Sequence, residues 1–104
     1  MSDEKIYKGV NTICTHVGQV KDELYGSSVS PIYPGTSYEY IDKEIDRYPR
    51  YSSTPNQEFL SKKIAALEGT EDAMIFGSGM AAISTSLLAF LNSGDHIILQ
   101  NDIY

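Results

Sequence analysis

The hydrophobic positions between residues 55 and 68 recur at the spacing of an amphipathic helix. Leu60, Ile64 and Leu67 stand at i, i+4 and i+7, which places their side chains on one face. The two lysines of this stretch lie off that face. The pattern therefore predicts a helix over residues 55–68 with a single apolar stripe.

Both ends of this predicted helix carry capping residues. Thr54 is suited to the N-cap, Pro55 to the first helical position, and Gln57 completes a T-x-x-Q capping box. Gly69 is suited to the C-terminal end, because glycine readily adopts the left-handed conformation with which many helices finish. The local sequence thus specifies where the helix starts and where it stops.

Two short apolar runs, at residues 73–76 and 96–100, predict strands that are buried on both faces. Between them, Gly77-Ser78-Gly79 ends the first run and opens a second predicted helix over residues 79–91, which Asn92-Ser93-Gly94 ends. The order helix, strand, helix, strand with short connections predicts a βαβ unit in a parallel sheet.

The two halves of the chain differ in character. The 79–91 helix is apolar around most of its surface and needs cover on several sides, and two parallel strands are too few for a stable sheet. Residues 55–104 are therefore expected to begin a larger α/β domain. Residues 1–54 hold three of the four prolines and every tyrosine except Tyr104, and are expected to form an extended arm without a core of its own.

Charge and composition narrow the class of protein. Fourteen acidic and eight basic residues give a formal charge of −6, which argues against a nucleic-acid binder because phosphate recognition requires a basic face. No apolar run approaches the roughly 18 residues of a membrane span, and no secretory signal is visible. Cys14 is the only cysteine, and His16 and His96 lack metal-ligand spacing, so no disulfide or metal site is expected. These features predict a cytoplasmic protein.

A glycine-rich turn between a buried strand and a helix is a candidate phosphate site. Gly77-Ser78-Gly79-Met80 fits this pattern, because glycines let the backbone approach an anion and the helix N-terminus offers free N–H groups. The turn is neither a Walker A sequence nor a complete G-x-G-x-x-G fingerprint, which argues against a nucleoside triphosphate or a dinucleotide. Many such turns contain glycine only to reverse the chain, and that alternative stays open.

Tyr48-Pro49-Arg50-Tyr51 is a second candidate phosphate site. An arginine can bind a phosphate with two parallel hydrogen bonds, and a tyrosine hydroxyl can donate a third. On the residues alone, however, the charged stretch 42–50 is more simply interpreted as a solvated surface loop.

The motifs taken together resemble those of the Cys/Met-metabolism (trans-sulfuration) family of pyridoxal-phosphate (PLP) enzymes. This family includes cystathionine γ-synthase, cystathionine β- and γ-lyases, methionine γ-lyase and homoserine sulfhydrylases. The matching stretches run in family order along nearly the whole chain and are Thr15-His16-Val17-Gly18, Ser30-Pro31-Ile32-Tyr33, Tyr48-x-Arg50, Leu67-Glu68-Gly69, Gly77-Ser78-Gly79-Met80-Ala81-Ala82-Ile83, Gly94-Asp95-His96-Ile97-Ile98 and Asp102-Ile103-Tyr104.

The resemblance implies a role for five residues. Tyr48 and Arg50 match the pair that reaches the cofactor phosphate of a neighbouring subunit, and Gly79 and Met80 match the residues whose backbone N–H groups bind that phosphate within their own subunit. Tyr104 matches the tyrosine that stacks on the pyridine ring and takes part in proton transfer.

The chain departs from the family pattern after the Tyr-x-Arg motif. Where the family has Asn-Pro-Thr, this chain has Thr54-Pro55-Asn56, with one extra residue after Arg50. This leaves open how the Tyr48–Arg50 loop is held. The family's Schiff-base lysine and substrate-binding arginine have no counterpart in residues 1–104, so this segment alone is not expected to run the reaction.

The resemblance implies a fold-type I, aspartate-aminotransferase-like domain with three α/β/α layers. Residues 1–54 are expected to be an arm that contacts a neighbouring subunit, and residues 55–104 the start of the PLP-binding large domain, in a tetramer built from dimers. The implied activity is elimination on a sulfur-containing amino acid such as cystathionine or methionine. The alternatives are γ-replacement, as in cystathionine γ-synthase or O-acetylhomoserine sulfhydrylase, and a non-catalytic interaction module. The Tyr48-x-Arg50 motif speaks against an aminotransferase.

Overall fold

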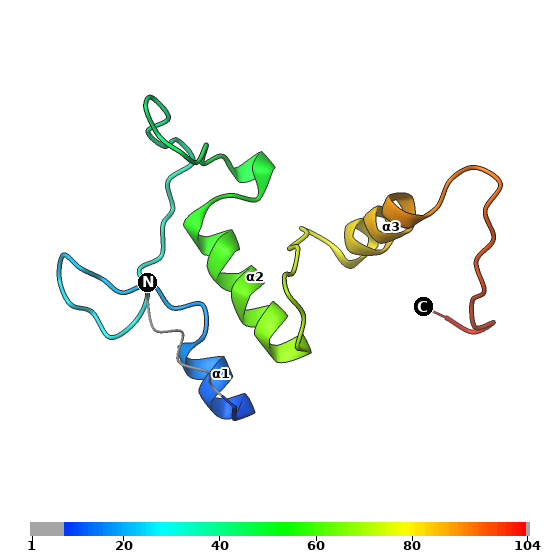
Figure 1. The fold of residues 1–104 in the computed structure, drawn as a ribbon, viewed down its shortest axis with the longest axis horizontal. Helices are drawn as coiled ribbons and strands as arrows, with labels where there is room; N and C mark the ends of the chain where they lie inside the picture. Colours follow the sequence, from blue (N-terminus) through cyan, green and yellow to red (C-terminus); the bar gives the residue numbers. More distant parts are fainter. Residues whose placement is uncertain (1–7, 104) are drawn as a thin grey trace.

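A computed structural model describes residues 8–103 of the chain (Figure 1). These residues form three α-helices, a short 3-10 helix and long connecting segments, and no strand lies among them. The elements are α1 (Val10–His16), η1 (Pro49–Tyr51), α2 (Pro55–Glu68) and α3 (Gly79–Phe90).

Helix α2 confirms the predicted element at both ends. Thr54 and Gln57 form the capping box: the Thr54 backbone N–H and hydroxyl both donate to Gln57 Oε1, at 3.3 and 2.7 Å. At the other end Gly69 is left-handed, with φ of 68°, and its N–H donates to the carbonyl of Ala65. Local capping therefore fixes α2 at the residues that the sequence indicated.

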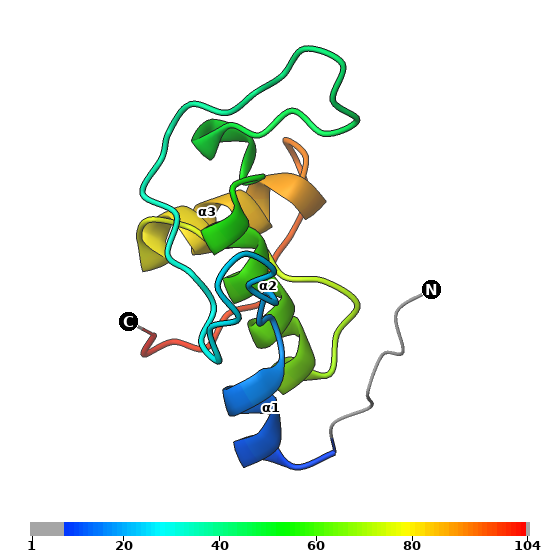
Figure 2. The same ribbon diagram turned by 90° about the vertical axis from the view of Figure 1, so that its left-hand side faces the viewer.

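Helix α1 lies in the segment that was expected to be an extended arm, and it corrects that prediction. Most of its residues are β-branched or polar types with low helix propensity. Its N-cap is Gly9, which has no side chain with which to cap the helix. Figures 1 and 2 show α1 beside the C-terminal half of α2, and these two are the only α-helices in contact within the described part of the chain. Tertiary packing thus stabilises a helix that its own sequence does not specify.

The chain passes very close to α2 at Gly18. A Cβ atom at this position would lie 2.3 Å from the carbonyl oxygen of Phe59, and Gly18 has a φ of +74°. Both the approach and the left-handed backbone require glycine. Gly18 therefore lets the segment that follows α1 lie directly against the backbone of α2.

Asn56 holds another part of the arm to α2. Its side-chain amide donates to the carbonyl of Tyr33 at 2.7 Å, and its Oδ1 accepts the Tyr33 N–H at 3.0 Å. The rings of Tyr33 and Phe59 meet edge to face, with centroids 6.3 Å apart. The asparagine that departs from the family order therefore anchors the arm.

The two predicted strands are not formed, which corrects the prediction of a paired βαβ unit within the described residues. Residues 73–76 and 96–100 lie on either side of α3 but belong to no hydrogen-bonded ladder. A strand requires a partner for its N–H and C=O groups, and two strands alone make no stable sheet. Apolar character in these runs is therefore insufficient to build the sheet.

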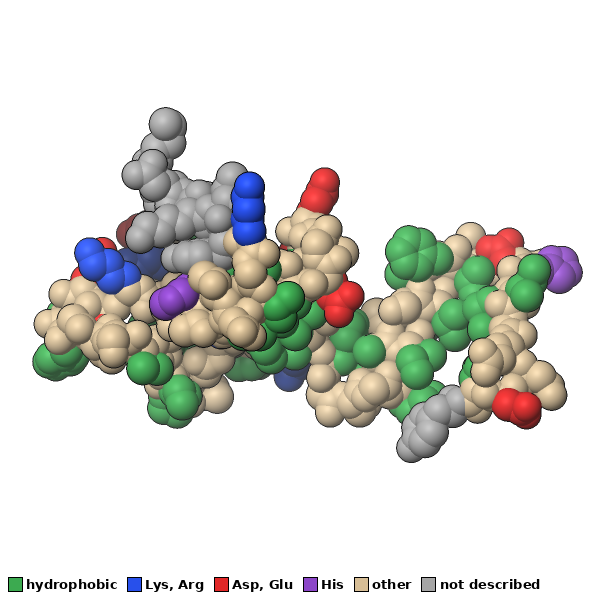
Figure 3. All heavy atoms as spheres, turned by 90° about the horizontal axis from the view of Figure 1, so that it is seen from below, with side chains coloured by type: hydrophobic (Ala, Val, Ile, Leu, Met, Phe, Trp, Pro, Cys, Tyr) green, Lys and Arg blue, Asp and Glu red, His purple; other side chains and the backbone are tan. Residues whose placement is uncertain are grey.

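Helix α3 matches its predicted range to within one residue. Most apolar side chains of α3 and of the segment that follows it are exposed. Leu88, Phe90 and Ile98 are 80%, 83% and 99% exposed, and Ala65 is the only buried hydrophobic residue among residues 8–103. Figure 3 shows hydrophobic side chains gathered on the surface of the part of the chain that holds α3. Such a large apolar surface requires covering by other structure.

We expect the 104-residue chain, expressed alone, to behave as a molten or insoluble species. Its exposed apolar surface should bind a hydrophobic dye, and heating should give no cooperative transition, because too little side-chain area is buried to offset chain entropy. Near-UV circular dichroism and calorimetry would check this. A sharp calorimetric transition of the isolated monomer would contradict it.

Candidate functional site

Tyr48 and Arg50 lie together in an exposed turn at η1. The turn is closed by the Tyr51 N–H, which donates to the Tyr48 carbonyl at 2.9 Å. The Arg50 guanidinium carbon lies 5.6 Å from the centroid of the Tyr48 ring, and the rings of Tyr48 and Tyr51 meet edge to face at 5.3 Å. A phenol and a guanidinium thus project from one short turn, both open to an anion.

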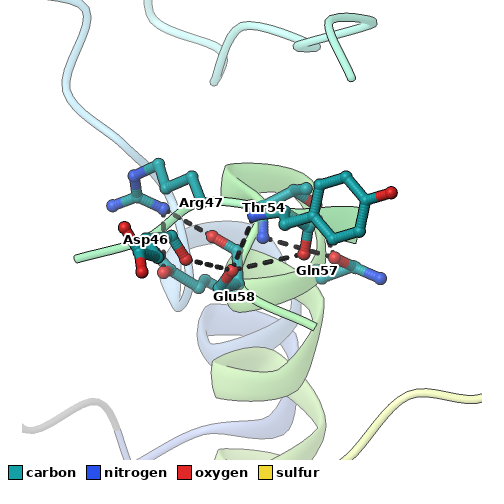
Figure 4. Close-up of polar contacts among 7 residues, drawn as sticks. Asp46, Arg47, Thr54, Gln57 and Glu58 are labelled. Atoms are coloured by element: carbon teal, nitrogen blue, oxygen red, sulfur yellow. Dashed lines mark hydrogen bonds and ion pairs between the residues drawn. The ribbon is translucent and has the colours of Figure 1, made fainter. Parts of the chain in front are cut away.

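Arg47 joins this turn to α2 (Figure 4). Its Nη1 donates to Glu58 Oε1 at 2.8 Å and to the Ser53 carbonyl at 2.8 Å. The side chains of Arg47 and Glu58 are each 30% exposed. The charged stretch 42–50 is therefore more than a solvated loop, because one of its arginines is committed to an ion pair with the first turn of α2.

Ser53 and Gln57 hold the backbone of the same turn. The Ser53 hydroxyl accepts the Tyr48 N–H at 2.9 Å and donates to the carbonyl of Asp46 at 2.8 Å. The Gln57 amide donates to the carbonyl of Pro49 at 3.1 Å. These contacts hold the Tyr48–Arg50 loop in place although the chain lacks the family's Asn-Pro-Thr order.

Gly79 and Met80 open helix α3. The Ser78 hydroxyl caps the helix by accepting the Ala81 N–H at 3.1 Å, and the N–H groups of Gly79 and Met80 have no intrahelical acceptor. Open space surrounds Gly79, where a Cβ would meet nothing within 4 Å. The first turn of α3 can therefore receive an anion on its backbone amides, although no cation is supplied there.

A single chain does not bring these two groups of residues together. Among residues 8–103, η1 is bonded to α2 through Gln57 and Pro49 but makes no contact with α3, and Figure 1 shows η1 and α3 on separate segments of the chain. The predicted catalytic residue Tyr104 lies outside the described residues. The described part of the chain holds no cluster of three or more metal-ligating side chains, and no helix in it is long and apolar enough to cross a membrane.

Sequence reasoning missed Arg47, Ser53 and Glu58 as supports of the candidate site. The one signal available was the proximity of Arg47 and Ser53 to the Tyr48–Arg50 motif. Nothing in a periodic pattern pairs Arg47 with Glu58, because Arg47 lies in a connecting segment, 11 positions before Glu58 of α2.

Comparison with known proteins identifies the family. The model of the "Cys/Met metabolism PLP-dependent enzyme" family matches residues 11–104. The chain is 35% identical to a canavanine gamma-lyase of Rhizobium leguminosarum over 102 residues, covering 89% of the chain and 25% of the relative. It is 36% identical to a cystathionine gamma-lyase of Bacillus subtilis over 95 residues, with 89% and 25% covered.

A third relative is an L-methionine gamma-lyase of Fusobacterium nucleatum, 34% identical over 107 residues, with 92% of the chain and 27% of the relative covered. No solved structure matches the chain significantly. The chain thus spans about a quarter of the length of these curated relatives. Because the family model covers nearly all of the sequence, the chain belongs to the Cys/Met metabolism family of PLP-dependent enzymes, a family of fold-type I.

Proposed function

We propose that this chain forms part of a PLP-dependent lyase that acts on sulfur-containing amino acids such as cystathionine or methionine. Residues 1–54 are its arm toward a neighbouring subunit, and residues 55–104 begin its three-layer PLP-binding domain. Family membership and relatives named as cystathionine and methionine lyases support the proposal. In this proposal the full-length protein consists of this chain and the remainder of the PLP-binding domain.

The observation that supports the proposal most strongly is that two groups able to bind an anion lie on two separate elements. The exposed Tyr48–Arg50 turn offers a guanidinium and a phenol, and the first turn of α3 offers backbone N–H groups in open space. The phosphate of PLP carries close to two negative charges, and the amides of Gly79 and Met80 leave much of that charge uncompensated. Arg50 supplies the missing positive charge.

The separation of the two groups within one chain supports a site shared between subunits. We assign the Gly79 and Met80 amides to the phosphate of their own subunit, and Tyr48 and Arg50 to the phosphate of the neighbour, in a dimer that pairs into a tetramer. When bound, PLP supplies the electron sink that stabilises a carbanion at the substrate's α-carbon. This chain's residues bind and orient the phosphate end. Cys14, the single cysteine, is free and exposed, which suits a reducing compartment such as the cytoplasm.

A γ-replacing synthase is the second candidate, because relatives at similar identity carry that name. They include a probable cystathionine gamma-synthase of Herpetosiphon aurantiacus, 35% identical, and a Bacillus subtilis protein named cystathionine gamma-synthase/O-acetylhomoserine (thiol)-lyase, 33% identical. Incubating the full-length protein with cystathionine, and separately with O-acetylhomoserine and a thiol, distinguishes the two. Elimination releases ammonia and a 2-oxo acid, whereas replacement gives a thioether without ammonia. No turnover of cystathionine, of methionine, or of O-acetylhomoserine with a thiol would contradict both candidates.

Tyr104 is proposed to stack on the pyridine ring and assist proton transfer. Tyr104→Ala should remove a contact worth about 0.5–1.5 kcal/mol beyond its buried area and weaken PLP binding accordingly. Tyr104→Phe should keep the stacking and lose the hydroxyl, so that kcat falls more than PLP affinity. Equal PLP affinity and kcat in the wild type and both variants would show that Tyr104 has no role at the cofactor.

A further inference from the structure

Two arginines flank Pro49 within four positions, and the structure gives them opposite environments. Arg47 is two-thirds shielded and paired with Glu58 at 2.8 Å, whereas Arg50 is exposed and has no carboxylate partner within residues 8–103. The charge of Arg47 is thus largely neutralised inside the protein. The charge of Arg50 remains available to a ligand.

The Tyr48–Arg50 turn is fastened to α2 from both sides. On one side Arg47 reaches Glu58 and the Ser53 carbonyl, and on the other Gln57 donates to the Pro49 carbonyl (Figure 4). Glu58 and Gln57 both belong to the first turn of α2, which its capping box fixes. A three-residue turn with exposed side chains is thereby attached to the best-specified element of the chain.

We infer that Arg47 and Glu58 are positioning residues for phosphate binding. Their ion pair holds the Tyr48–Arg50 turn on α2, so that the Arg50 guanidinium and the Tyr48 phenol are already placed when the neighbouring subunit presents its PLP phosphate. Holding these side chains in place beforehand reduces the entropy lost on binding. This inference rests on the proposed function, because Arg47 can affect PLP binding in this way only if Arg50 binds the PLP phosphate.

The test is a double-mutant cycle on PLP affinity in the full-length protein, measured by equilibrium dialysis of the apoprotein. Arg47→Met should raise the dissociation constant for PLP about tenfold in the wild-type background. In the Arg50→Ala background the same change should add less than about twofold, because the group that Arg47 positions is already gone. Glu58→Gln keeps an acceptor for Arg47, so we expect it to raise the constant only about threefold.

Lys43→Met provides the matched control. It breaks a second ion pair among the described residues of the arm, Lys43 to Glu39 at 2.9 Å, whose side chains are 49% and 75% exposed. PLP affinity should be unchanged. If Arg47→Met destabilises the apoprotein, Glu58→Gln carries the comparison, with thermal unfolding of each apoprotein recorded alongside.

The outcomes separate this inference from the function on which it rests. An unchanged PLP affinity in Arg47→Met and Glu58→Gln, or equal weakening by Arg47→Met in both backgrounds, overturns the positioning role while Arg50 keeps its assignment. No effect of Arg50→Ala on PLP affinity overturns the phosphate role of Arg50 and the positioning role together.

Discussion

Replacement of Arg50 by alanine is expected to raise the dissociation constant for PLP by at least about tenfold in the full-length protein. A hydrogen bond to a charged group contributes about 1.5–3 kcal/mol, and about 1.4 kcal/mol corresponds to a factor of ten. Arg50→Lys should recover only part of the affinity, because an ammonium lacks the planar fork that binds two phosphate oxygens. Equilibrium dialysis of the apoproteins against PLP measures both effects.

Two controls separate a lost phosphate contact from other causes. Arg50 is exposed and forms no ion pair within residues 8–103, so Arg50→Ala should change the unfolding free energy of the apoprotein by no more than about 0.5 kcal/mol. Lys62→Ala removes the same charge from an exposed position on α2 and should leave PLP affinity unchanged. Wild-type PLP affinity in Arg50→Ala would show that Arg50 binds no cofactor phosphate.

Gly18→Ala should destabilise the full-length protein by about 2–4 kcal/mol, a large effect for one methyl group. The left-handed backbone of Gly18, with φ of +74°, accounts for part of this cost. The rest arises because the new Cβ would lie 2.3 Å from the Phe59 carbonyl oxygen, an atom of the α2 backbone that has little freedom to move. Denaturant unfolding of the apoprotein measures the loss.

Gly26 offers a matched control for this prediction. It has a similar φ of +68°, but a Cβ there would meet nothing within 4 Å. Gly26→Ala should therefore lower the free energy of unfolding by only about 1 kcal/mol, the cost of placing alanine in a left-handed backbone conformation. Equal losses in the two variants would mean that close packing at Gly18 contributes nothing to the attachment of the arm to α2.

The helices differ in how far the sequence could predict them. Helix α2 was predicted to the residue because Thr54, Gln57 and Gly69 act locally, within one turn of each end. Helix α1 escaped prediction because its residues have low helix propensity and its stabilising partner is α2, a helix far along the sequence. Capping residues and helix propensity therefore predict a helix only when the helix does not depend on tertiary contacts for its stability.

The strands and the site illustrate the same limit. The run at 73–76 is apolar enough for a buried strand, but a strand forms only when other strands pair with it. Tyr48 and Arg50 could be proposed because a family resemblance singled them out, while the residues alone favoured a solvated loop. The Arg47–Glu58 pair required the fold, since no local rule links a charge in a connecting segment to a charge on a helix 11 positions later.

In the proposed dimer, Arg50 of one subunit binds the PLP phosphate that the neighbouring subunit holds. Subunit mixing tests this arrangement most directly, by combining Arg50→Ala subunits with subunits in which the PLP-binding lysine has been replaced. In a hybrid dimer one site then has an intact lysine from the first subunit and an intact Arg50 from the second. At a PLP concentration too low to fill the Arg50→Ala dimers, both preparations should be inactive when kept separate and should regain activity on mixing. Hybrid dimers that are shown to form by differential tagging and yet stay inactive would contradict the claim.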